Sequence, residues 1–565
     1  MLPPTRNRGP ELPVHARRTT HIPARVALVA ASVGLTALCL PAGPSVWLVL
    51  VLFAPLALAL RVARPLAGLA LGWLFGALVW GASTWWMSHA FVNMLDWPAA
   101  GAWAATAGFC LFRGLPYGLL GLACGILHVR GHRAGPLFCA GLLTALTALW
   151  GTVFPGSLAL ALVPWPVALQ AADLGGEHLV LFLLLAANWL AAEAVARLRR
   201  PKEALGALAA LAVLVASVSW YGAARMEHFR SLEAAAGPER FLAVTTVQPN
   251  VPLTGTAGLD TSGSYFGALG ALVRGTEAAA RTLPEADLVL WPEVPKGIDC
   301  DCEAFGLAGV PEAAALAGGP VLASCVEHTF ADEPPVVTFS EEDGASRSMT
   351  VQRIAAMYNA LWLVGAEGCG RVYRKVELVP FGERTPWREG MPWLHHLLGR
   401  ELEYSRGAGP GLVRLPDAGR GSGQEGGLAV QPLICFESGF PALVRAGVAR
   451  GADALVNVAD DAWFASASAA RTHLGLAVLR AVEQRRPLVR CTNNGYGAHV
   501  RADGSIVPGS LTPMDEAAVR HARLFCPTER TVYARFGDYW LWVVGALAAL
   551  RLAAGVLVTG PVRRP

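Results

Sequence analysis

The stretch GLAVQPLICFES at residues 427–438 is a mostly apolar run that ends in Cys435 and Glu437. Other short apolar runs also end in polar residues: FLAVTTVQPN at 241–250, ADLVLWPEVP at 286–295, and ADALVNVADDAWF at 452–464. Continuous apolar runs of this length are typical of central strands buried on both faces. Helical stretches separate them, at 264–282 and 468–485. The pattern predicts an α/β sandwich with a ligand site at the carboxyl ends of its strands.

The composition indicates that the chain contains a large apolar part in addition to the α/β domain. The chain has 565 residues, of which 54% are hydrophobic and 16% charged, and its mean hydropathy is +0.42. A soluble domain carries about 25% charged residues, and a disordered chain has few apolar residues and a high net charge. The formal net charge of +4 is too small for a nucleic-acid-binding protein. We therefore expect an integral membrane protein with a large water-soluble part and no nucleic-acid partner.

Eight apolar runs approach or exceed the length of about 20 residues that spans a bilayer. They lie near 25–40, 45–60, 66–88, 99–128, 136–155, 177–197, 204–222 and 539–558. Charges return from about residue 240. The expected organisation is a cytoplasmic basic arm (1–24), a seven-span membrane domain (25–222), a catalytic domain (223–538), and a final span with a cytoplasmic tail (539–565).

Basic residues mark every second connection between the apolar runs. They are Arg6, Arg8, Arg17, Arg18 and Arg25, then Arg61 and Arg64, then Arg130 and Arg133, then Arg197, Arg199, Arg200 and Lys202. The turns near 41–45, 89–98 and 156–176 contain no Lys or Arg. The positive-inside rule then places both termini in the cytoplasm and residues 223–538 outside. The first run resembles a signal peptide in length, but without a small-x-small cleavage site an uncleaved anchor is favoured.

Lysine is rare in this chain. The sequence contains 43 arginines, which are expected to mark topology and surface, but only three lysines, Lys202, Lys296 and Lys375. A site that needs a compact ammonium would keep lysine where arginine fails. Each candidate also has an ordinary structural interpretation: a solvated surface lysine for Lys375, an inert buried thiol for Cys435, and a helix cap for Glu293.

The eleven cysteines show no C-x-x-C pair, and Cys300 and Cys302 are too close to pair easily with each other. We therefore expect no disulfide framework. The sequence has no H-E-x-x-H motif and no cluster of His and Cys, so no metal site is expected.

Three blocks together are more specific than any one residue. LVLWPE (288–293), YRKVELVPFGE (373–383) and PLICFES (432–438) resemble the Glu-Lys-Cys blocks of the nitrilase, or carbon–nitrogen hydrolase, superfamily. The middle block is similar to that of its membrane branch, the apolipoprotein N-acyltransferase family. Further similar blocks follow over the whole chain: PVALQAADLGG (166–176), MYNA (357–360), VNVADDAWF (456–464), RTHLGLAVLRAVEQRRPLVRCTNNG (471–495), DGSI (503–506) and TVYARFGD (531–538).

The resemblance implies an α-β-β-α sandwich and assigns roles to residues. Cys435 would be the nucleophile and Glu293 the general base. Lys375 would stabilise the oxyanion together with the backbone N–H of Phe436. The remaining residues are expected to support the site or position substrate: Glu383 beside the lysine or the base, Glu437 in the nucleophile loop or in a structural salt bridge, Asn359, and Trp463.

The resemblance also implies a reaction without a cofactor. Cys435 would take an acyl chain from a phospholipid as a thioester, and the α-amine of a diacylglyceryl-cysteine apolipoprotein would then accept it. The enzyme would be a monomer in the bacterial inner membrane, surrounded by membrane lipids, with its catalytic domain on the periplasmic side. Membrane spans would supply an apolar groove for acyl chains. Two alternatives remain open: a membrane-bound amidase, and an inactive lipoprotein-binding scaffold.

The sequence departs from the family pattern at several positions. Asp460 stands where N-D-x-W-F has Asn, Gly497 stands where T-N-x-G-x-S has Ser, and residues 331–343 look like an insertion. His473 is either a substrate contact or a satisfied structural histidine. Five tryptophans suit a membrane-interface belt or mobile arms nearby: Trp85, Trp86, Trp97, Trp463 and Trp540.

Overall fold

The computed structural model describes most of the chain. The described residues are 21–40, 46–95, 97–151, 154–251, 261–293, 300–332, 336–342, 345–351, 354–366, 368–386, 390–393, 403–416 and 427–557. The basic arm up to residue 20, the segment 417–426 and the tail from residue 558 lie outside them.

A polytopic helical membrane domain is built from the expected apolar runs. Its helices are α2 (His21–Cys39), η1 (Val46–Val51), α3 (Ala54–Leu60), α4 (Pro65–Thr84), α5 (Met87–Leu95), α6 (Ala99–Val129), α7 (Pro136–Leu149), η2 (Leu158–Leu162), α8 (Pro166–Leu169), α9 (Ala172–Ala196), α10 (Pro201–Ala235) and, near the end of the chain, α18 (Tyr539–Leu557). Within the described residues, six helices are long and apolar enough to cross a membrane: α2, α4, α6, α9, α10 and α18. Trp47–Leu60 and Pro136–Leu149 are shorter apolar helices, so the count of eight spans stays a prediction.

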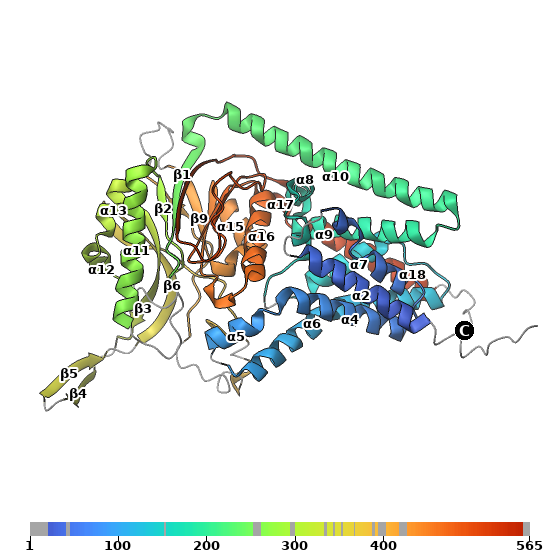
Figure 1. Cartoon of the computed structure of the whole chain (residues 1–565), viewed down its shortest axis with the longest axis horizontal. Helices are drawn as coiled ribbons and strands as arrows, with labels where there is room; N and C mark the ends of the chain where they lie inside the picture. Colours follow the sequence, from blue (N-terminus) through green and yellow to red (C-terminus); the bar gives the residue numbers. More distant parts are fainter. Residues whose placement is uncertain are drawn as a thin grey trace, which may run out of the picture.

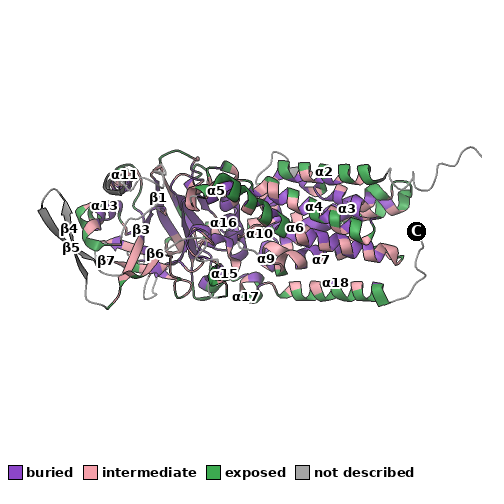
Figure 2. Cartoon of the chain, turned by 90° about the horizontal axis from the view of Figure 1, so that it is seen from below, coloured by how far each residue is buried: buried purple, intermediate pink, exposed green. Residues whose placement is uncertain are grey.

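Helices α4 and α6 pack at backbone contact. A Cβ added to Gly68 would collide with the carbonyl group of Gly121, and one added to Gly72 would collide with that of Tyr117. Small residues at such positions allow close helix approach where lipid removes the hydrophobic driving force. Residues at this contact, such as Gly68, Gly72 and Gly121, are buried, and exposed residues occur elsewhere on the two helices (Figure 2).

Helix α10 joins the two parts of the molecule. Its 35 residues extend about 52 Å at 1.5 Å per residue, far more than a ~30 Å hydrocarbon layer. It runs along the whole membrane domain and reaches the α/β domain before β1 begins (Figure 1). The helix therefore continues 13 residues beyond the expected boundary at residue 222, as its end at Ala235 shows.

The α/β domain contains two stacked sheets. The first has the order β13-β1-β2-β3-β6-β7: β13 (Ala518–Phe525), β1 (Phe241–Gln248), β2 (Leu288–Leu290), β3 (Val321–Phe330), β6 (Ile354–Gly365) and β7 (Gly368–Arg374). The second has the order β12-β11-β10-β9-β8: β12 (Ala498–Val500), β11 (Leu488–Thr492), β10 (Ala454–Ala459), β9 (Ala429–Ile434) and β8 (Val413–Arg414). A separate hairpin, β4 (Val336–Glu342) and β5 (Ala345–Val351), includes much of the suspected insertion.

Helices cover both outer faces of the sheets. The first sheet carries α11 (Thr261–Thr282), α12 (Cys302–Leu307) and α13 (Val310–Ala317), and the second carries α15 (Pro441–Ala449) and α16 (Ala467–Gln484) (Figure 1). A short helix, α17 (Val532–Phe536), precedes α18. Apolar side chains from both sheets, such as Leu290 and Val456, form the core between them. The α-β-β-α sandwich is confirmed, with its strands and principal helices where the sequence predicts them.

The expectation of no disulfide framework was wrong. Cys300 is bonded to Cys325 on β3, and Cys302 is bonded to Cys369 on β7. The sequence separations are 25 and 67 residues, so sheet topology, rather than local spacing, brings the partners together.

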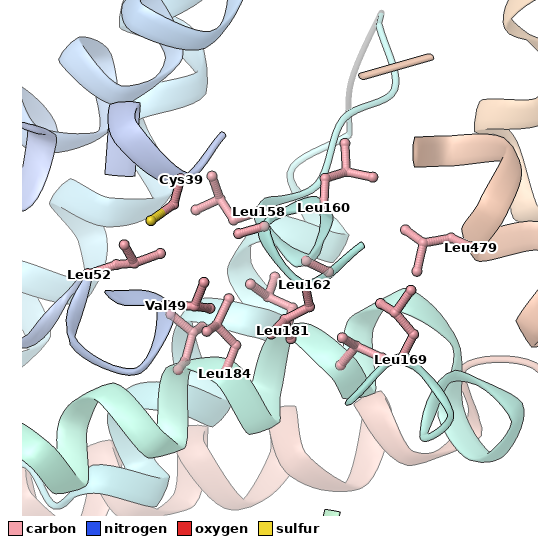
Figure 3. Packing of buried hydrophobic residues seen from close by; sticks show 14 of the residues in the cluster. Cys39, Val49, Leu52, Leu158, Leu160, Leu162, Leu169, Leu181, Leu184 and Leu479 are labelled. Carbon is pink, nitrogen blue, oxygen red and sulfur yellow. The ribbon is translucent and has the colours of Figure 1, made fainter. Parts of the chain in front are cut away.

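An apolar interface joins the membrane domain to the sandwich. Leucines of η2 and α9 share one core cluster with Leu479 of α16 (Figure 3). Through this cluster the outer helical layer of the second sheet rests on the membrane helices.

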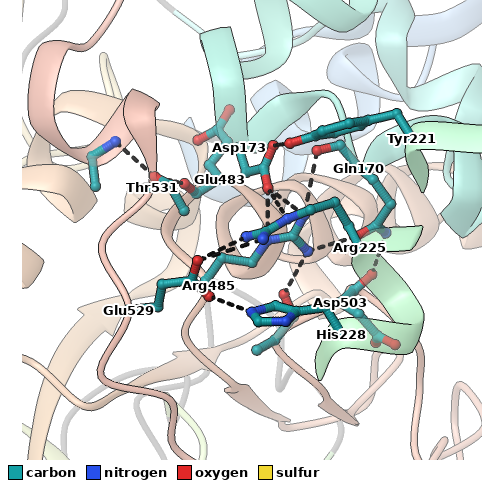
Figure 4. A network of polar contacts seen from close by, with 12 residues as sticks. Gln170, Asp173, Tyr221, Arg225, His228, Glu483, Arg485, Asp503, Glu529 and Thr531 are labelled. Atoms are coloured by element: carbon teal, nitrogen blue, oxygen red, sulfur yellow. Dashed lines mark hydrogen bonds and ion pairs between the residues drawn. The ribbon is translucent and has the colours of Figure 1, made fainter. Parts of the chain in front are cut away.

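A buried polar network runs through the same interface (Figure 4). Asp173 of α9 accepts hydrogen bonds from Tyr221 at 2.6 Å and from Arg225 at 3.0 Å, both on α10. Arg485, just beyond α16, donates to Asp173 at 2.8 Å and to the side chain of Gln170 at 2.6 Å. The expectation that arginines mark surface fails here, because an aspartate from another domain neutralises the buried guanidinium.

Candidate active site

Three strand ends bring the expected triad together. Glu293 follows β2, Lys375 follows β7 directly, and Cys435 follows β9. The Nζ of Lys375 lies 3.5 Å from Oε1 of Glu293, and 5.7 Å from the ring centre of Phe436, the residue after the cysteine. Cys435 has a φ of +55°, a left-handed conformation that turns the chain sharply from β9 into the 3₁₀ helix η4 (Cys435–Gly439).

Lys375 is an almost fully buried cation with two carboxylate partners. Its Nζ donates to Oε1 of Glu383 at 2.9 Å, in addition to the contact with Glu293. Burial alone would lower the pKa of Lys375, but the carboxylates of Glu293 and Glu383 raise it above its ordinary value. The side chain therefore stays an ammonium, and the interpretation of Lys375 as a solvated surface lysine is wrong.

Asn359 on β6 connects the two carboxylates. Its Nδ2 donates to Oε1 of Glu293 at 2.7 Å and to Oε1 of Glu383 at 3.1 Å. Glu383 is held in turn by the backbone N–H of Val379, which donates to its Oε2 at 2.7 Å. Asn359 therefore contacts the candidate base Glu293, and Glu383 contacts Lys375. Both residues lie where a supporting role was expected.

The thiol of Cys435 is held protonated. Burial, followed by the negative charge of Glu293, raises its pKa well above the ordinary value, and Lys375 only partly opposes this. Because the thiolate is the reactive form of cysteine, attack requires transfer of the proton to a base at the moment of reaction. Glu293 is a candidate for that base, because it follows β2 of the facing sheet and its negative charge acts on the thiol.

Glu437 connects the turn at Cys435 (the nucleophile turn) to the segment that follows Lys375 (the lysine loop). Its carboxylate accepts hydrogen bonds from the backbone N–H groups of Ile434, Val376 and Glu377 at 2.7–3.0 Å, and from the hydroxyl of Tyr373. Among the described residues, the hydrogen-bond donors to Glu437 are uncharged. The alternative that Glu437 forms a structural salt bridge is therefore not supported. Burial raises the pKa of Glu437 to about 7, although the backbone donors oppose the shift.

Cys435 is among the residues that line an apolar cavity of about 120 Å³. Membrane helices line one side, with Trp80 and Phe91 among its residues, and the sandwich lines the other, with Phe436 and Trp463. The carbonyl group of Trp463 accepts a hydrogen bond from Asn93 of α5 at 3.1 Å, which fixes the 3₁₀ turn η5 (Ala462–Phe464) to the membrane domain. An apolar groove between spans and sandwich is therefore present, as expected.

The tryptophans have different surroundings. Trp86 lines the cavity and Trp97 stacks on Phe91. Trp540 donates a hydrogen bond to the carbonyl oxygen of Gly175 at 2.9 Å. Trp85 is 40% exposed, which fits the expected interfacial position.

A second polar group lies beside the triad and was only partly anticipated. Asp461 accepts hydrogen bonds from Arg490 with both oxygens, at 3.0 and 2.9 Å, and contacts Nδ1 of His473 at 2.8 Å. Although burial opposes it, Arg490 and His473 hold the pKa of Asp461 below its ordinary value. The sequence did not single out Arg490. The one hint was the pair of aspartates after a buried strand, since a buried carboxylate requires a cationic or hydrogen-bonding partner. His473 is satisfied at Nδ1, while its buried Nε2 has no partner among the described residues.

No group of three or more His, Cys, Asp or Glu able to hold a metal ion occurs within the residues that the structure describes. The described residues bring together a buried thiol, carboxylates, an ammonium and an apolar cavity, which are the groups that acyl transfer through a covalent intermediate requires.

Comparison with known proteins identifies the family. Residues 243–522 match the carbon-nitrogen hydrolase family, and residues 32–190 match the apolipoprotein N-acyltransferase N-terminal domain. An apolipoprotein N-acyltransferase of Gloeobacter violaceus is 31% identical over 557 residues, covering 94% of both chains. The chain belongs to the apolipoprotein N-acyltransferase family.

Other relatives with this name agree over most of their length. The one from Allorhizobium ampelinum is 29% identical and covers 86% of this chain and 85% of its own. The one from Bdellovibrio bacteriovorus is 28% identical and covers 81% of this chain and 80% of its own. The family assignment therefore includes both the membrane domain and the sandwich.

Proposed function

We propose that this chain transfers an acyl chain from a phospholipid to the α-amine of the N-terminal diacylglyceryl-cysteine of apolipoproteins. The observation that carries the proposal is the apolar cavity that the buried Cys435 lines together with residues of both domains. An amidase of small polar substrates has no use for such a lining, whereas an acyl chain fills it. The names of the relatives add independent support.

The first step is acylation of the enzyme. Glu293 takes the proton of Cys435 as the sulfur attacks the ester carbonyl carbon of the phospholipid. The oxyanion that forms is stabilised by the ammonium of Lys375 and by the backbone N–H of Phe436. Collapse of this intermediate breaks the ester C–O bond, and the alkoxide takes the proton from Glu293 and leaves as a lysophospholipid. The acyl chain remains on Cys435 as a thioester.

The second step transfers the acyl chain to the acceptor. The neutral α-amine attacks the thioester carbonyl carbon, and the same donors stabilise the second oxyanion. Glu293 takes a proton from the nitrogen, the C–S bond breaks, and Glu293 passes this proton to the departing sulfur, which restores the thiol of Cys435. Burial of Cys435 (7% exposed) and Lys375 (1% exposed) keeps water from hydrolysing the thioester.

The supporting residues are proposed to hold this geometry. Asn359 and Glu383 position Glu293 and Lys375, and Glu437 keeps the nucleophile turn in register with the lysine loop. Trp463 closes the cavity against α5. In the proposed steps each proton and each developing charge is assigned to a protein group.

The catalytic domain is proposed to lie on the periplasmic side of the bacterial inner membrane, with both termini in the cytoplasm. The alternation of basic loops with loops that contain no Lys or Arg supports this orientation. The two disulfides support it independently, because such bonds persist in oxidising compartments and are rare in the cytosol. We propose that the enzyme acts as a monomer.

The test is detection of the acyl-enzyme. The full chain in detergent micelles containing phosphatidylethanolamine with an isotope-labelled palmitoyl chain should gain the mass of that chain on Cys435. The adduct should be cleaved by neutral hydroxylamine and discharged by a diacylglyceryl-cysteine peptide, with the label recovered on its α-amine. Cys435→Ala is the control and should remain unmodified.

Other outcomes separate the rivals. An adduct that is discharged only by water would identify a lipid hydrolase and refute the transferase. Absence of any adduct, together with unchanged lipoprotein acylation in cells that carry only Cys435→Ala, would identify a scaffold.

A further inference from the structure

Asp460 is a buried carboxyl group that makes no ion pair with any described residue. Its Oδ1 accepts hydrogen bonds from the backbone N–H of Ala462 at 3.1 Å and from Nδ2 of Asn493 at 3.2 Å. Its Oδ2 is buried and has no hydrogen-bond partner among the residues that the structure describes. One buried polar atom of this side chain thus has no partner within the described part of the chain.

The sheet places Asp460 beside the nucleophile. Strand β10 lies between β9 and β11, with Val458 paired with Ile434 and Ala459 paired with Thr492. Asp460, the first residue after β10, thus leaves the sheet at the same edge as Cys435, the first residue after β9. Both side chains line the apolar cavity.

The surroundings of Asp460 favour the neutral acid. Burial, followed by the negative charges of Glu293 and Asp461, raises its pKa well above the ordinary value. The nearby cations are engaged elsewhere, Lys375 by two glutamates and Arg490 by Asp461. Because Oδ1 already accepts two hydrogen bonds, the proton belongs on Oδ2. That O–H is a donor for which the described protein provides no acceptor.

We propose that Asp460 is a neutral hydrogen-bond donor to the carbonyl oxygen of the acyl group held at Cys435. This inference rests on the proposed function. A buried donor without an acceptor costs free energy, and an ester or thioester carbonyl in the cavity removes that cost. Neutral carboxylic acids act in this way in other enzymes when an apolar site keeps them protonated.

The same view explains the departure from the family pattern at this position. A protonated aspartate has the shape of asparagine, with one oxygen that accepts and one group that donates. The Asn of N-D-x-W-F would place its N–H₂ where Asp460 places its O–H. The substitution in this chain thereby keeps a donor toward the cavity, and an ionised Asp460 would not.

The experiment compares Asp460→Asn with Asp460→Ala in the full chain. Rates of acylation of Cys435 are measured by intact mass in micelles of phosphatidylethanolamine with a ¹³C-carbonyl palmitoyl chain. Asp460→Asn retains a donor and should acylate within about threefold of the wild-type rate. Asp460→Ala removes the donor and should be slower by about 10²-fold, the usual effect of losing one oxyanion donor. Asp460→Ala at the wild-type rate, or Asp460→Asn as slow as Asp460→Ala, would overturn the proposal.

A spectroscopic measurement keeps the test independent of folding. A hydrogen bond lowers the stretching frequency of a carbonyl group, so the isotope-edited infrared band of the thioester should rise from wild type to Asp460→Asn and again to Asp460→Ala. If Asp460→Ala does not fold, the inference is tested by the difference in thioester band frequency between wild type and Asp460→Asn alone. Coincident bands would refute the inference and leave the proposed function standing. A wild-type chain that forms no thioester would refute both.

Discussion

Arg485 donates two hydrogen bonds to the same oxygen of Asp173, at 2.8 and 3.2 Å, across the boundary between sandwich and membrane domain (Figure 4). Arg485 is fully buried and Asp173 is 2% exposed. Asp173 also accepts hydrogen bonds from Tyr221 and Arg225 of α10. One carboxylate therefore connects α9, α10 and the segment after α16.

Asp173→Ala should therefore destabilise the whole protein. It leaves the fully buried guanidinium of Arg485 without its carboxylate and that of Arg225 with only Glu529. Removing one side of a buried pair costs about 3–5 kcal/mol. Thermal unfolding in detergent should show a large drop in midpoint. Glu227→Ala removes the partner of Arg230 in an exposed pair on α10 and should change stability by less than about 0.5 kcal/mol. Equal midpoints for both variants would contradict a structural role for the Asp173 network.

Glu437 should make stability depend on pH. Its pKa rises from an ordinary value of 4.5 to about 7 on burial. Because the folded-state pKa is raised, its contribution to stability is fully present below pH 4.5 and is lost as the pH rises through 7. At about 1.4 kcal/mol per pKa unit the loss amounts to about 3 kcal/mol.

Glu437→Gln cannot titrate, and comparison with it isolates this group. The free energy of unfolding of wild type minus that of Glu437→Gln should fall by about 3 kcal/mol between about pH 4.5 and about pH 8. Tyr373→Phe removes one donor, leaves the carboxyl in place, and should keep the wild-type pH dependence. A difference between wild type and Glu437→Gln that is constant with pH would show that Glu437 does not titrate in this range.

The sequence predicts the secondary-structure elements better than the contacts between residues of different elements. Short apolar runs before Glu293, Cys435 and Asp460 are strands, because full burial on both faces requires continuous apolar residues. The grouping of Glu293, Lys375 and Cys435 came instead from the resemblance of their sequence blocks to a known family, since these residues follow strands of two different sheets. Lys375 was conspicuous only because arginine replaces lysine almost everywhere else in this chain.

Features that depend on distant partners could not be predicted. Arg485 reads as a charged surface residue until Asp173, 312 positions away, is placed beside it. Cys302 and Cys369 carry no local signal of their pairing, and Arg490 is indistinguishable from neighbouring arginines. In each case the partner is distant in the sequence or lies on another strand, and periodicity contains no information about it.

The disulfides should be necessary for stability rather than for chemistry. Cys302→Ser combined with Cys369→Ser opens a loop of 67 residues and should cost about 2–5 kcal/mol. Cys526→Ala, at a buried free cysteine, is the control and should cost less. Alkylation of the unfolded chain should modify seven thiols without reductant and eleven after reduction. Eleven modified thiols without reductant would contradict both bonds.

Asn359 should matter for rate more than for stability. It donates to both Glu293 and Glu383, so Asn359→Ala frees the candidate base to move, and displacements of about 1 Å lower rates by about 10²-fold. Asn359→Asp should be slower still, because a third carboxylate would repel the other two. Acylation rates of Cys435 measured by intact mass test this order. Equal rates for Asn359→Asp and wild type would show that Asn359 does not position the base.

The cavity lining should set which acyl chains are accepted. Ala90 of α5 lines the cavity and is buried, whereas Val92 on the same helix is 38% exposed and is absent from the lining. Ala90→Trp fills space that a long chain would occupy, so adducts formed from an equal mixture of lauroyl and stearoyl phospholipids should shift toward lauroyl. Val92→Trp adds the same bulk outside the cavity and should leave the adduct ratio of wild type unchanged.

Stability and selectivity can be separated in this comparison. Overpacking at Ala90 costs about 1–3 kcal/mol, which lowers the amount of active protein but acts equally on both acyl chains. The ratio of the two adducts is therefore the informative quantity. If Ala90→Trp lowers both adducts in parallel and keeps their ratio, the acyl chain binds elsewhere. The apolar groove between the spans and the sandwich would then have to be assigned to the lipid anchor of the acceptor.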